Sequence, residues 1–303
     1  MPEPDPADNP GAPADVLAER RQLIGLCFRM LGTMADAEDA VQETWVRWYR
    51  LAETEREAIQ NPAAWRTRVA GRVCLDLLGS ARARRELYVG EWLPEPVPAG
   101  SHLSGSGRVS ADPLDRVSLD ESVSTALLVV LESMTPAERV AFVLHDVFAL
   151  PFPEIAEIVG RTPAAVRQLA TAARRRVADG RRSSVSRERH DDVARAFGAA
   201  ARGGDLQALT ALLDPGVTLR SDGGGRVSAA RNPVHGADNV VRFLLGLLAK
   251  NRQLRVEERY SADGLGYVTT LDGVVTGVLS LGIRDGRITD LWIMVNPEKL
   301  TSW

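Results

Sequence analysis

The stretch TPAERVAFVLHDVFALPFPEIAEIVGRTPAAVRQLATAARRRV, residues 135–177, decides the fold of the segment around it. Thr135 and Glu138 have the spacing of a capping box, which predicts that a helix begins here. The following PFPEIAEIVG predicts a short amphipathic helix that ends at Gly160, and Thr162 with the proline after it predicts the start of a longer helix. Two helices joined by a short glycine-bearing turn predict a helix-turn-helix.

The second of these helices carries residue types that read DNA. The N-terminal end of a recognition helix usually meets base edges in the major groove, where Arg reads guanine and Gln reads adenine. The residues expected at or near this end are Arg161, Thr162, Ala165, Arg167 and Gln168. Further along, Arg174 and Arg175 suit phosphate contacts. A helical hairpin with a solvated basic face is the alternative.

The whole chain has 303 residues, which is long for one hydrophobic core and predicts several domains. Its formal net charge of -3 gives no sign of nucleic-acid binding, so DNA contact must be argued segment by segment. Residues 1–14 are rich in proline and polar residues and predict a disordered leader. No apolar run approaches the roughly 20 residues that span a bilayer and no signal pattern is present, so we expect a cytoplasmic protein that does not contact membranes.

Cys27 and Cys74 are the two cysteines of the chain, and each lies in an apolar helical pattern without a metal-ligand spacing. We therefore interpret both as buried free thiols. The sequence predicts no bound metal and no cofactor.

The N-terminal segment is helical in pattern, and its second helix is DAEDAVQETWVRWYR, residues 36–50. Asp36 is expected to cap this helix. Val41, Trp45 and Trp48 form an apolar stripe that most simply packs in a core. The acidic opposite face is either solvated or meets a basic partner.

A third helix is predicted from Asn61-Pro62 onward, in NPAAWRTRVAGRVCLDLLGSARARRE. It combines an apolar stripe with many arginines. Basic residues interleaved with an aromatic suit single-stranded or distorted DNA, because bases stack on rings while arginines follow the backbone. The candidate DNA-binding residues are Arg66, Arg68, Arg72, Arg82, Arg84 and Arg85.

The composition then shifts to Pro, Gly and Ser, which predicts a linker over residues 88–117. Within it Trp92, Leu93, Pro94, Glu95 and Pro96 place a large apolar pair in a stiff proline frame. Flexible tethers rarely need a tryptophan, so we expect WLPEP to dock on another part of the protein.

The last third, residues 188–303, predicts helices near 188–202, 205–213 and 236–250, followed by alternating runs with Asp-Gly pairs at 263–264, 272–273 and 285–286. Such pairs are typical of tight turns between antiparallel strands. The pattern predicts an α+β domain with a curved antiparallel sheet.

Taken together, residues 15–182 resemble a bacterial RNA polymerase sigma factor of the extracytoplasmic-function (ECF) type. The resemblance implies a sigma2-like helical domain (15–87) and a sigma4-like helix-turn-helix domain (118–182). It implies that 36–50 binds the β′ clamp of core RNA polymerase, that the third helix melts and reads the -10 promoter element, and that 135–177 reads the -35 element and meets the β flap. The implied polymerase-binding residues are Asp36, Asp39, Gln42, Glu43 and Trp45.

The last third is similar to the SnoaL-like domain fused to one subgroup of these factors, the SigJ-like proteins. Three stretches carry that resemblance: YVGEWLPEP (88–96), DGGGR (222–226) and NPEKL (296–300). The resemblance implies that the last domain regulates the sigma core. The implied regulatory contacts are, besides WLPEP, Asp222, Gly223, Gly224, Gly225, Arg226, Asn296, Pro297, Glu298, Lys299 and Leu300.

Two further possibilities stay open for the last domain, namely a small-molecule sensor and an isomerase- or cyclase-type enzyme. Catalysis would need a carboxylate and a histidine converging in one dry pocket, and the candidates are Asp222, His235 and Asp290. A lone histidine at a helix start is more often a packing residue. We therefore expect a promoter-recognition factor without a catalytic site, with a ligand in the C-terminal pocket left open.

Two of the three stretches also have simpler interpretations. For NPEKL, a C-terminal cap and a docking element are equally compatible with the sequence. For SDGGGRV (221–227), a phosphate loop would need a following helix that begins within the stretch, and none is predicted. We expect instead a strand-to-strand turn with Asp222 and Arg226 at its shoulders, facing the sigma core or the linker.

Overall fold

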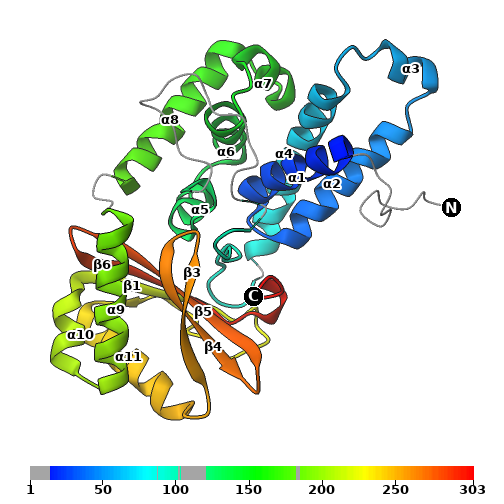
Figure 1. Ribbon diagram of the computed structural model, residues 1–303. Helices are drawn as coiled ribbons and strands as arrows, with labels where there is room; N and C mark the ends of the chain where they lie inside the picture. Colours follow the sequence, from blue (N-terminus) through cyan, green and yellow to red (C-terminus); the bar gives the residue numbers. More distant parts are fainter. Residues whose placement is uncertain (1–13, 87, 102, 104–120, 182–184) are drawn as a thin grey trace. The chain divides into compact units, whose positions relative to one another are not determined.

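The computed structural model describes residues 14–86, 88–101, 103, 121–181 and 185–303 (Figure 1). The leader predicted for residues 1–14 and the second half of the predicted linker fall almost wholly outside this range. The chain divides into two compact units. The first consists of Met1–Arg84, His102–Val123 and Val130–Val177, and the second of Arg85–Ser101, Ser124–Val129 and Ala178–Trp303. The first half of the linker thus belongs to the same unit as the last third of the chain.

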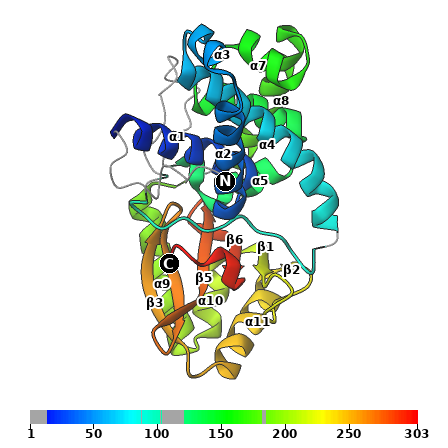
Figure 2. The ribbon, with the colours of Figure 1, turned by 90° about the vertical axis from the view of Figure 1, so that its right-hand side faces the viewer.

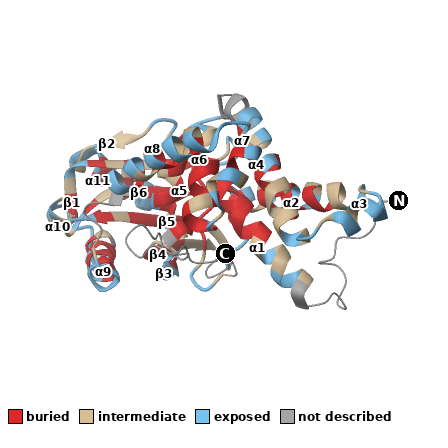
Figure 3. Ribbon diagram, turned by 90° about the horizontal axis from the view of Figure 1, so that it is seen from above, coloured by how far each residue is buried: buried red, intermediate tan, exposed pale blue. Residues whose placement is uncertain are grey.

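The first unit is built from helices. They are α1 (Ala14–Leu31), α2 (Met34–Tyr49), α3 (Glu53–Ala58), α4 (Pro62–Glu86), the 3₁₀ turn η2 (Glu121–Val123), α5 (Thr125–Glu132), α6 (Pro136–Phe142), the π-helical turn η3 (Val143–Val147), α7 (Phe152–Val159) and α8 (Pro163–Arg181). Helix α5 begins in the second unit and ends in the first, and α4 and α8 end in the second. The C-terminal half of α1 is buried and red in Figure 3, whereas its earlier turns are paler.

Helix starts follow the predicted chemistry with one exception. Thr135 and Glu138 form the predicted capping box. Asp36, however, is not the cap of α2: that position is held by Thr33, whose hydroxyl accepts from the Asp36 N–H and donates to the Asp36 carboxylate. The helix begins two residues earlier than predicted, because the Gly32-Thr33 pair ends α1 and caps α2 in immediate succession.

Two buried arginines connect the helices of the first unit. Arg29, which is 1% exposed, donates to Ser122 Oγ at 2.6 Å and to the Leu103 carbonyl at 3.0 Å. Arg139 donates to the Met30 carbonyl at 2.8 Å, and burial lowers its pKa to about 10, so it remains charged at neutral pH. Each arginine satisfies carbonyls or hydroxyls that would otherwise be buried without a partner.

Cys27 and Cys74 are free and buried in the first unit, as predicted. They are neighbours, and burial followed by the contact with Cys27 raises the pKa of the Cys74 thiol. The Cys74 thiol is therefore held in the neutral form inside the core.

The second unit is α+β. Its elements are α9 (Arg187–Gly203), α10 (Leu206–Leu212), β1 (Leu213–Asp222), β2 (Val234–His235), α11 (Ala237–Lys250), β3 (Arg255–Ser261), β4 (Gly264–Leu271), β5 (Val274–Arg284), β6 (Arg287–Met294) and the 3₁₀ turn η4 (Pro297–Lys299). The strands form one sheet in the order β2-β1-β6-β5-β4-β3. The Asp-Gly turns at 263–264, 272–273 and 285–286 join β3 to β6 as antiparallel hairpins, as predicted.

The predicted antiparallel sheet contains one parallel pair of strands that the sequence did not indicate. Strand β1 pairs with β6 in parallel, so the sheet is mixed. The cause is topological: β1 is followed by β2, α11 and the three strands β3 to β5 before the chain returns beside it as β6. A parallel neighbour of this kind leaves no short-range turn signal in the sequence.

Alternation along the strands gives the sheet two apolar faces. Tyr267, Leu291 and Ile293 point to the face covered by α9, α10 and α11 (Figure 1). Val268 and Trp292, one residue away, point to the other face, where they pack with Leu93 of the linker and Leu300 near the C-terminus. The helices thus cover one face of the sheet, and the linker with the C-terminal residues covers part of the other.

Candidate functional site

The three stretches singled out in the second unit meet at one carboxylate, that of Asp222. This residue ends β1 and is fully buried, at 0% exposure. Its oxygens accept four hydrogen bonds, from Tyr88 Oη (2.6 Å), Leu93 N (2.9 Å), Gly224 N (2.9 Å) and Lys299 Nζ (2.8 Å). Two of these donors come from the linker, and a third from the NPEKL stretch. We call this group of residues the latch.

The parallel pairing of β1 with β6 places these parts together. Asp222 is in register with Met294, and the Val295 N–H donates to the Asp222 carbonyl at 2.8 Å. The chain after β6 therefore turns into η4 directly beside the end of β1. Residues 88–101 run along the same side of the sheet near the C-terminus (Figure 2).

Lys299 supplies the positive charge of the latch. It is 5% exposed and also donates to the Leu93 carbonyl at 2.6 Å. Its ammonium lies 4.1 Å from the ring centroid of Trp92 and 5.3 Å from that of Tyr88. Burying an ammonium costs several kcal/mol in desolvation, and the carboxylate, the carbonyl and the two aromatic faces offset this cost together.

Tyr88 connects two of the stretches through its hydroxyl. The hydroxyl donates to Asp222 and accepts from Asn296 Nδ2 at 3.1 Å. Burial, followed by the contact with Asp222, raises the pKa of Tyr88, so the phenol is protonated and acts as a donor at neutral pH. Tyr88 was quoted with the linker stretch but was not among the predicted contacts, because a single tyrosine carries no sign of a distant partner.

NPEKL has both of the roles that the sequence left open. Asn296 Oδ1 accepts from the Glu298 N–H at 3.1 Å and so caps η4, while Asn296 Nδ2 contacts Tyr88. Leu300 packs in the apolar cluster beneath the linker. Capping and docking are thus performed by one short segment.

WLPEP packs against the sheet and the C-terminal residues within the second unit, as expected for a stretch that docks. Leu93 is 2% exposed in the apolar cluster, and Pro94, Glu95 and Pro96 are also buried, while Trp92 is half-buried over Lys299. The C-terminal Trp303 donates its indole N–H to the Pro96 carbonyl at 2.8 Å. Trp303 was missed at the sequence level, since a terminal aromatic has no motif around it.

The glycines of DGGGR are required by close approaches. A Cβ on Gly223 would lie 2.2 Å from the Val227 carbonyl, and Gly224 has φ +63° with Asn296 2.5 Å from the Cβ position. Gly225 has φ +70° and faces Val89 of the linker. The turn is the start of an 11-residue connection (223–233) to β2, so the expectation that Arg226 lies at the second shoulder was wrong. Arg226 instead pairs with Glu298 at 2.5 Å on the surface.

The helix-turn-helix has the predicted geometry. Helix α7 ends at Gly160, which adopts the left-handed conformation at φ 68°, and α8 begins at Pro163. The Thr162 hydroxyl accepts from the Ala165 N–H at 3.2 Å and caps α8. Four of the five predicted base-reading residues are exposed, namely Arg161, Thr162, Arg167 and Gln168. The fifth, Ala165, is half-buried.

The predicted phosphate contacts of α8 differ from one another. Arg175 is exposed. Arg174 is half-buried and donates to the buried Asp146 carboxylate at 2.5 Å, which ties α8 to η3. This placement favours a packing role for Arg174.

The arginines of α4 likewise separate into buried and exposed ones. Arg66 is 8% exposed, donates twice to Glu19 at 2.6 Å and lies 4.7 Å from the ring centroids of both Trp45 and Trp48. Arg68 and Arg72 are more exposed than Arg66. Arg68 lies 3.9 Å from the Glu154 carboxylate, and Arg72 donates to the Glu157 carbonyl at 3.4 Å. The side chains of Arg82, Arg84 and Arg85 lie outside the described part of the chain.

The candidate polymerase-binding residues lie on α2. Asp39 and Gln42 are exposed, and Asp36 and Glu43 are half-buried. Trp45 is buried at 7% exposure beneath Arg66, which supports the core interpretation of the apolar stripe for this residue.

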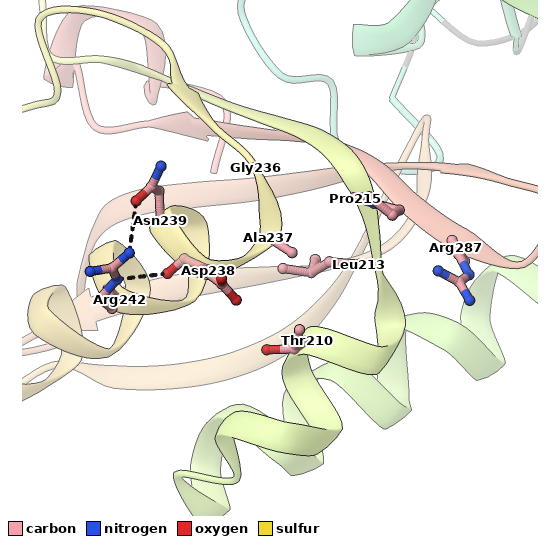
Figure 4. Close-up of a pocket in the computed structure, with 9 residues that line it drawn as sticks. All are labelled: Thr210, Leu213, Pro215, Gly236, Ala237, Asp238, Asn239, Arg242 and Arg287. Atoms are coloured by element: carbon pink, nitrogen blue, oxygen red, sulfur yellow. Dashed lines mark hydrogen bonds between the residues drawn. The ribbon is translucent and has the colours of Figure 1, made fainter.

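An open pocket of about 520 Å³ lies at the N-terminal end of α11 (Figure 4). Its lining residues are Thr210, Leu213, Pro215, Gly236, Ala237, Asp238, Asn239, Arg242 and Arg287. None of the three catalytic candidates lines it. Asp222 is enclosed in the latch, His235 contacts Thr218 Oγ1 at 3.2 Å, and Asp290 pairs with Arg284 at 3.1 Å. The carboxylates and the histidine do not converge.

Among the described residues, no cluster of three or more His, Cys, Asp or Glu side chains could hold a metal ion. In the same part of the chain, no helix combines the length and the apolar character needed to cross a membrane.

Comparison with known families gives two matches. Residues 16–84 match Sigma-70 region 2, and residues 124–177 match Sigma-70 region 4. These ranges contain α2, most of α4 and the helix-turn-helix.

Comparison with individual proteins extends the likeness to the whole chain. The ECF RNA polymerase sigma factor SigJ of Mycobacterium tuberculosis is 40% identical over 297 residues, covering 94% of this chain and 91% of that protein. The probable ECF RNA polymerase sigma factor SigI of the same species is 37% identical over 285 residues, covering 93% and 92%. The crystal structure of M. tuberculosis SigJ aligns with TM-score 0.70 and 36% identity, over 95% of this chain and 98% of that one.

Proposed function

The chain belongs to the extracytoplasmic-function family of RNA polymerase sigma factors, and from this premise we propose how its parts divide the work of transcription initiation. As a sigma factor it acts with core RNA polymerase on promoter DNA. The assignment of single residues and the role of the C-terminal domain are the proposals that follow.

The N-terminal end of α8 reads the -35 element. Arg161, Arg167 and Gln168 are exposed there and have side chains that bind base edges. Thr162 and Ala165 shape the helix start, and Arg175 contacts phosphate from the next turns. Arg174 supports α8 through Asp146.

The -10 element is read from α4, where Arg68 and Arg72 face outward more than Arg66 does. Arg66, on α4, contacts α1 through its ion pair with Glu19 and α2 through the rings of Trp45 and Trp48, so it holds the three helices together. The exposed acidic and amide side chains of α2, Asp39 and Gln42, meet the β′ clamp, and the region 4 segment meets the β flap.

The C-terminal domain controls the sigma core through the linker. The observation that carries this proposal is the latch: a buried carboxylate of the domain accepts from Tyr88 and Leu93 of the linker, and a buried ammonium of the domain donates to Leu93. Residues 88–97 follow directly on α4, so holding or releasing them changes how freely the -10 reading helix moves with respect to the rest of the factor.

The test is transcription in vitro with purified core RNA polymerase and a promoter that the full-length protein recognises. Tyr88→Phe removes the hydroxyl that joins Asp222 to Asn296 and is expected to change the yield of transcript severalfold. Tyr267→Phe is the matched control, because it removes a buried hydroxyl of the same domain that donates to the Ala194 carbonyl at 2.6 Å, on the opposite face of the sheet from Leu93. If the two variants behave alike, the latch has no regulatory role; if the wild-type protein initiates at no promoter, the sigma assignment fails.

A further inference from the structure

Strand β3 forms one edge of the sheet in the second unit. The strand order places it last, with β4 as its neighbour on one side. Every residue from Arg255 to Tyr260 is exposed. The unpaired N–H and C=O groups of an edge strand can form hydrogen bonds with another chain, so the outer side of β3 is a candidate interaction surface.

The linker occupies only the end of this edge. The Ala99 N–H donates to the Tyr260 carbonyl at 3.1 Å, and Pro98 forms a bridge with Ser261. The backbone groups of Tyr260 therefore point away from β4, and in an antiparallel pair this direction recurs at every second residue. The N–H and C=O groups of Val256 and Glu258 point outward for the same reason. Among the described residues, no strand pairs with this outer side of residues 255–259.

The side chains of β3 carry an alternating charge pattern. Arg255, Glu257 and Arg259 point to one face of the sheet, and Val256 points to the other. Glu257 pairs with Arg259 at 3.3 Å along the strand, and within the described ranges Arg255 forms no ion pair. The edge thus presents a positive, a negative and a positive side chain on one face and an apolar side chain, 36% exposed, on the other.

We propose that β3 is the interface for a second copy of this chain, with the two β3 strands pairing antiparallel about a two-fold axis at Val256. In this register Arg255 of each copy lies opposite Glu257 of the other, and the two Val256 side chains lie opposite each other. Such an interface is self-complementary, as a two-fold dimer requires. The inference goes beyond the proposed function and does not depend on it.

The backbone geometry favours the two ion pairs in this register. The outward groups of Val256 would form the hydrogen-bonded pair at the axis, so Arg255 and Glu257 would form the pairs without hydrogen bonds beside it. Residues in such pairs have Cα atoms about 4.5 Å apart, closer than in hydrogen-bonded pairs. Opposite charges at directly facing positions stabilise a strand pair.

A register with its axis at Glu257 is excluded by charge. It would place Arg255 of each copy opposite Arg259 of the other and would place the two Glu257 side chains opposite each other. Like charges at directly facing positions are destabilising, and all the charged pairs on this face would be of that kind.

A register with its axis at Glu258 is excluded by the linker. It would place Val256 of the second copy opposite Tyr260, where Ala99 already pairs. The two Glu258 carboxylates would also face each other. The register at Val256 combines opposite charges with the part of the edge that the linker leaves open.

The expected dimer is weak. Pairing over residues 254–258 covers less than the roughly 1,200 Å² of a standard stable interface, so half-association is expected on the order of 10–100 µM. Because the two ion pairs are exposed, added salt should weaken the dimer further.

The test is sedimentation equilibrium of the full-length protein over a range that spans this affinity. Arg255→Glu and Glu257→Arg each place like charges opposite each other, and each alone is expected to weaken association at least about tenfold. An equimolar mixture of the two variants should associate again, because both ion pairs are restored with reversed sign in the mixed dimer. Arg287→Glu is the matched control: it makes the same charge change at an exposed residue of β6, which β5 and β4 separate from β3.

Hydrogen exchange tests the backbone pairing independently. The amides of Val256 and Glu258 are expected to exchange more slowly as the protein concentration rises, because they donate across the dimer axis. The amide of Glu257 points to β4 in the monomer and in the dimer, so its exchange should not depend on concentration.

Two results overturn the proposal. A wild-type protein that stays monomeric over the whole range refutes a second copy as the occupant of the edge, including the case in which an extended segment of another protein binds there. A dimer that neither charge variant weakens, or that the mixture of variants does not restore, refutes pairing through β3 in this register. Both measurements are made without polymerase or DNA, so their outcome is separate from that of the proposed function.

Discussion

Replacing Lys299 by Met tests whether a buried charge pair holds the linker on the C-terminal domain. Lys299 and Asp222 are 5% and 0% exposed and lie 2.8 Å apart. Removing one partner of such a pair leaves a buried charge without compensation and typically costs about 3–5 kcal/mol. Since about 1 kcal/mol shifts the melting temperature by roughly 2–4 °C in domains of 150–250 residues, the expected loss is roughly 6–20 °C.

The double variant Asp222→Asn/Lys299→Met separates the charge from the packing. It removes both charges and keeps similar volumes, and buried pairs replaced in this way often lose little stability. The expected result is that the double variant is more stable than Lys299→Met alone, which gives a favourable coupling energy in a double-mutant cycle. Two measurements are made: urea unfolding gives the stability, and hydrogen exchange of residues 88–97 reports whether the linker stays bound.

The matched control is Arg226→Met, which breaks the other charge pair between the same two stretches. Arg226 and Glu298 are 64% and 61% exposed in their side chains, so this pair should contribute less than about 1 kcal/mol. The reasoning is refuted if Lys299→Met costs no more than Arg226→Met, or if the double variant loses the sum of its single losses.

Three further predictions follow from other contacts. Gly264→Ala should destabilise the protein by about 1–3 kcal/mol in urea unfolding, because of the positive φ and the contact with His190. Arg66→Met should lower the stability of the protein, because Arg66 is buried. Arg175→Met should leave stability unchanged but weaken DNA binding, because Arg175 is exposed. It should also reduce the slope of log K for DNA binding against log salt concentration by about one. Because burial raises the folded-state pKa of Asp263, its contribution to stability is present at low pH and is lost as pH rises through that pKa. Asp263→Asn should therefore gain stability relative to wild type as the pH rises above about 4, the usual pKa of an unfolded Asp, as measured by the urea midpoint at each pH.

Features set by neighbouring residues could be predicted from the sequence. The capping box at Thr135, the left-handed Gly160 and the Asp-Gly hairpins each depend on a few consecutive residues and local backbone geometry. The ECF assignment, confirmed by the matches over nearly the whole chain, rests on such segments in the right order. For the same reason the fold class was predictable even though one strand pairing was not.

The role of a charged side chain was not predictable in this way. Arg66 and Arg68 are two residues apart on α4, yet Arg66 is buried against the rings of two tryptophans and Arg68 is more exposed. Arg174 and Arg175 are adjacent, yet only Arg174 reaches the buried Asp146. An arginine-rich helix has a basic composition on every face, and only the packing of the neighbouring helices decides which arginines remain available to DNA.

The partners within the latch depend on the one strand pairing that the sequence did not reveal. Asp222 and Lys299 are 77 residues apart and belong to stretches that were each expected to make regulatory contacts. Parallel pairing of β1 with β6 places the end of β1 next to η4. Asp222, beside the three glycines, and Lys299, near the C-terminus, can therefore form an ion pair. The linker contributes only neutral groups to this site, because its Tyr88 hydroxyl and Leu93 backbone supply two donors and an acceptor, while both charges come from the C-terminal domain. In the proposed release of the linker, Asp222 and Lys299 both stay on the C-terminal domain, so opening would not require separating the two charges and would cost less than breaking their pair.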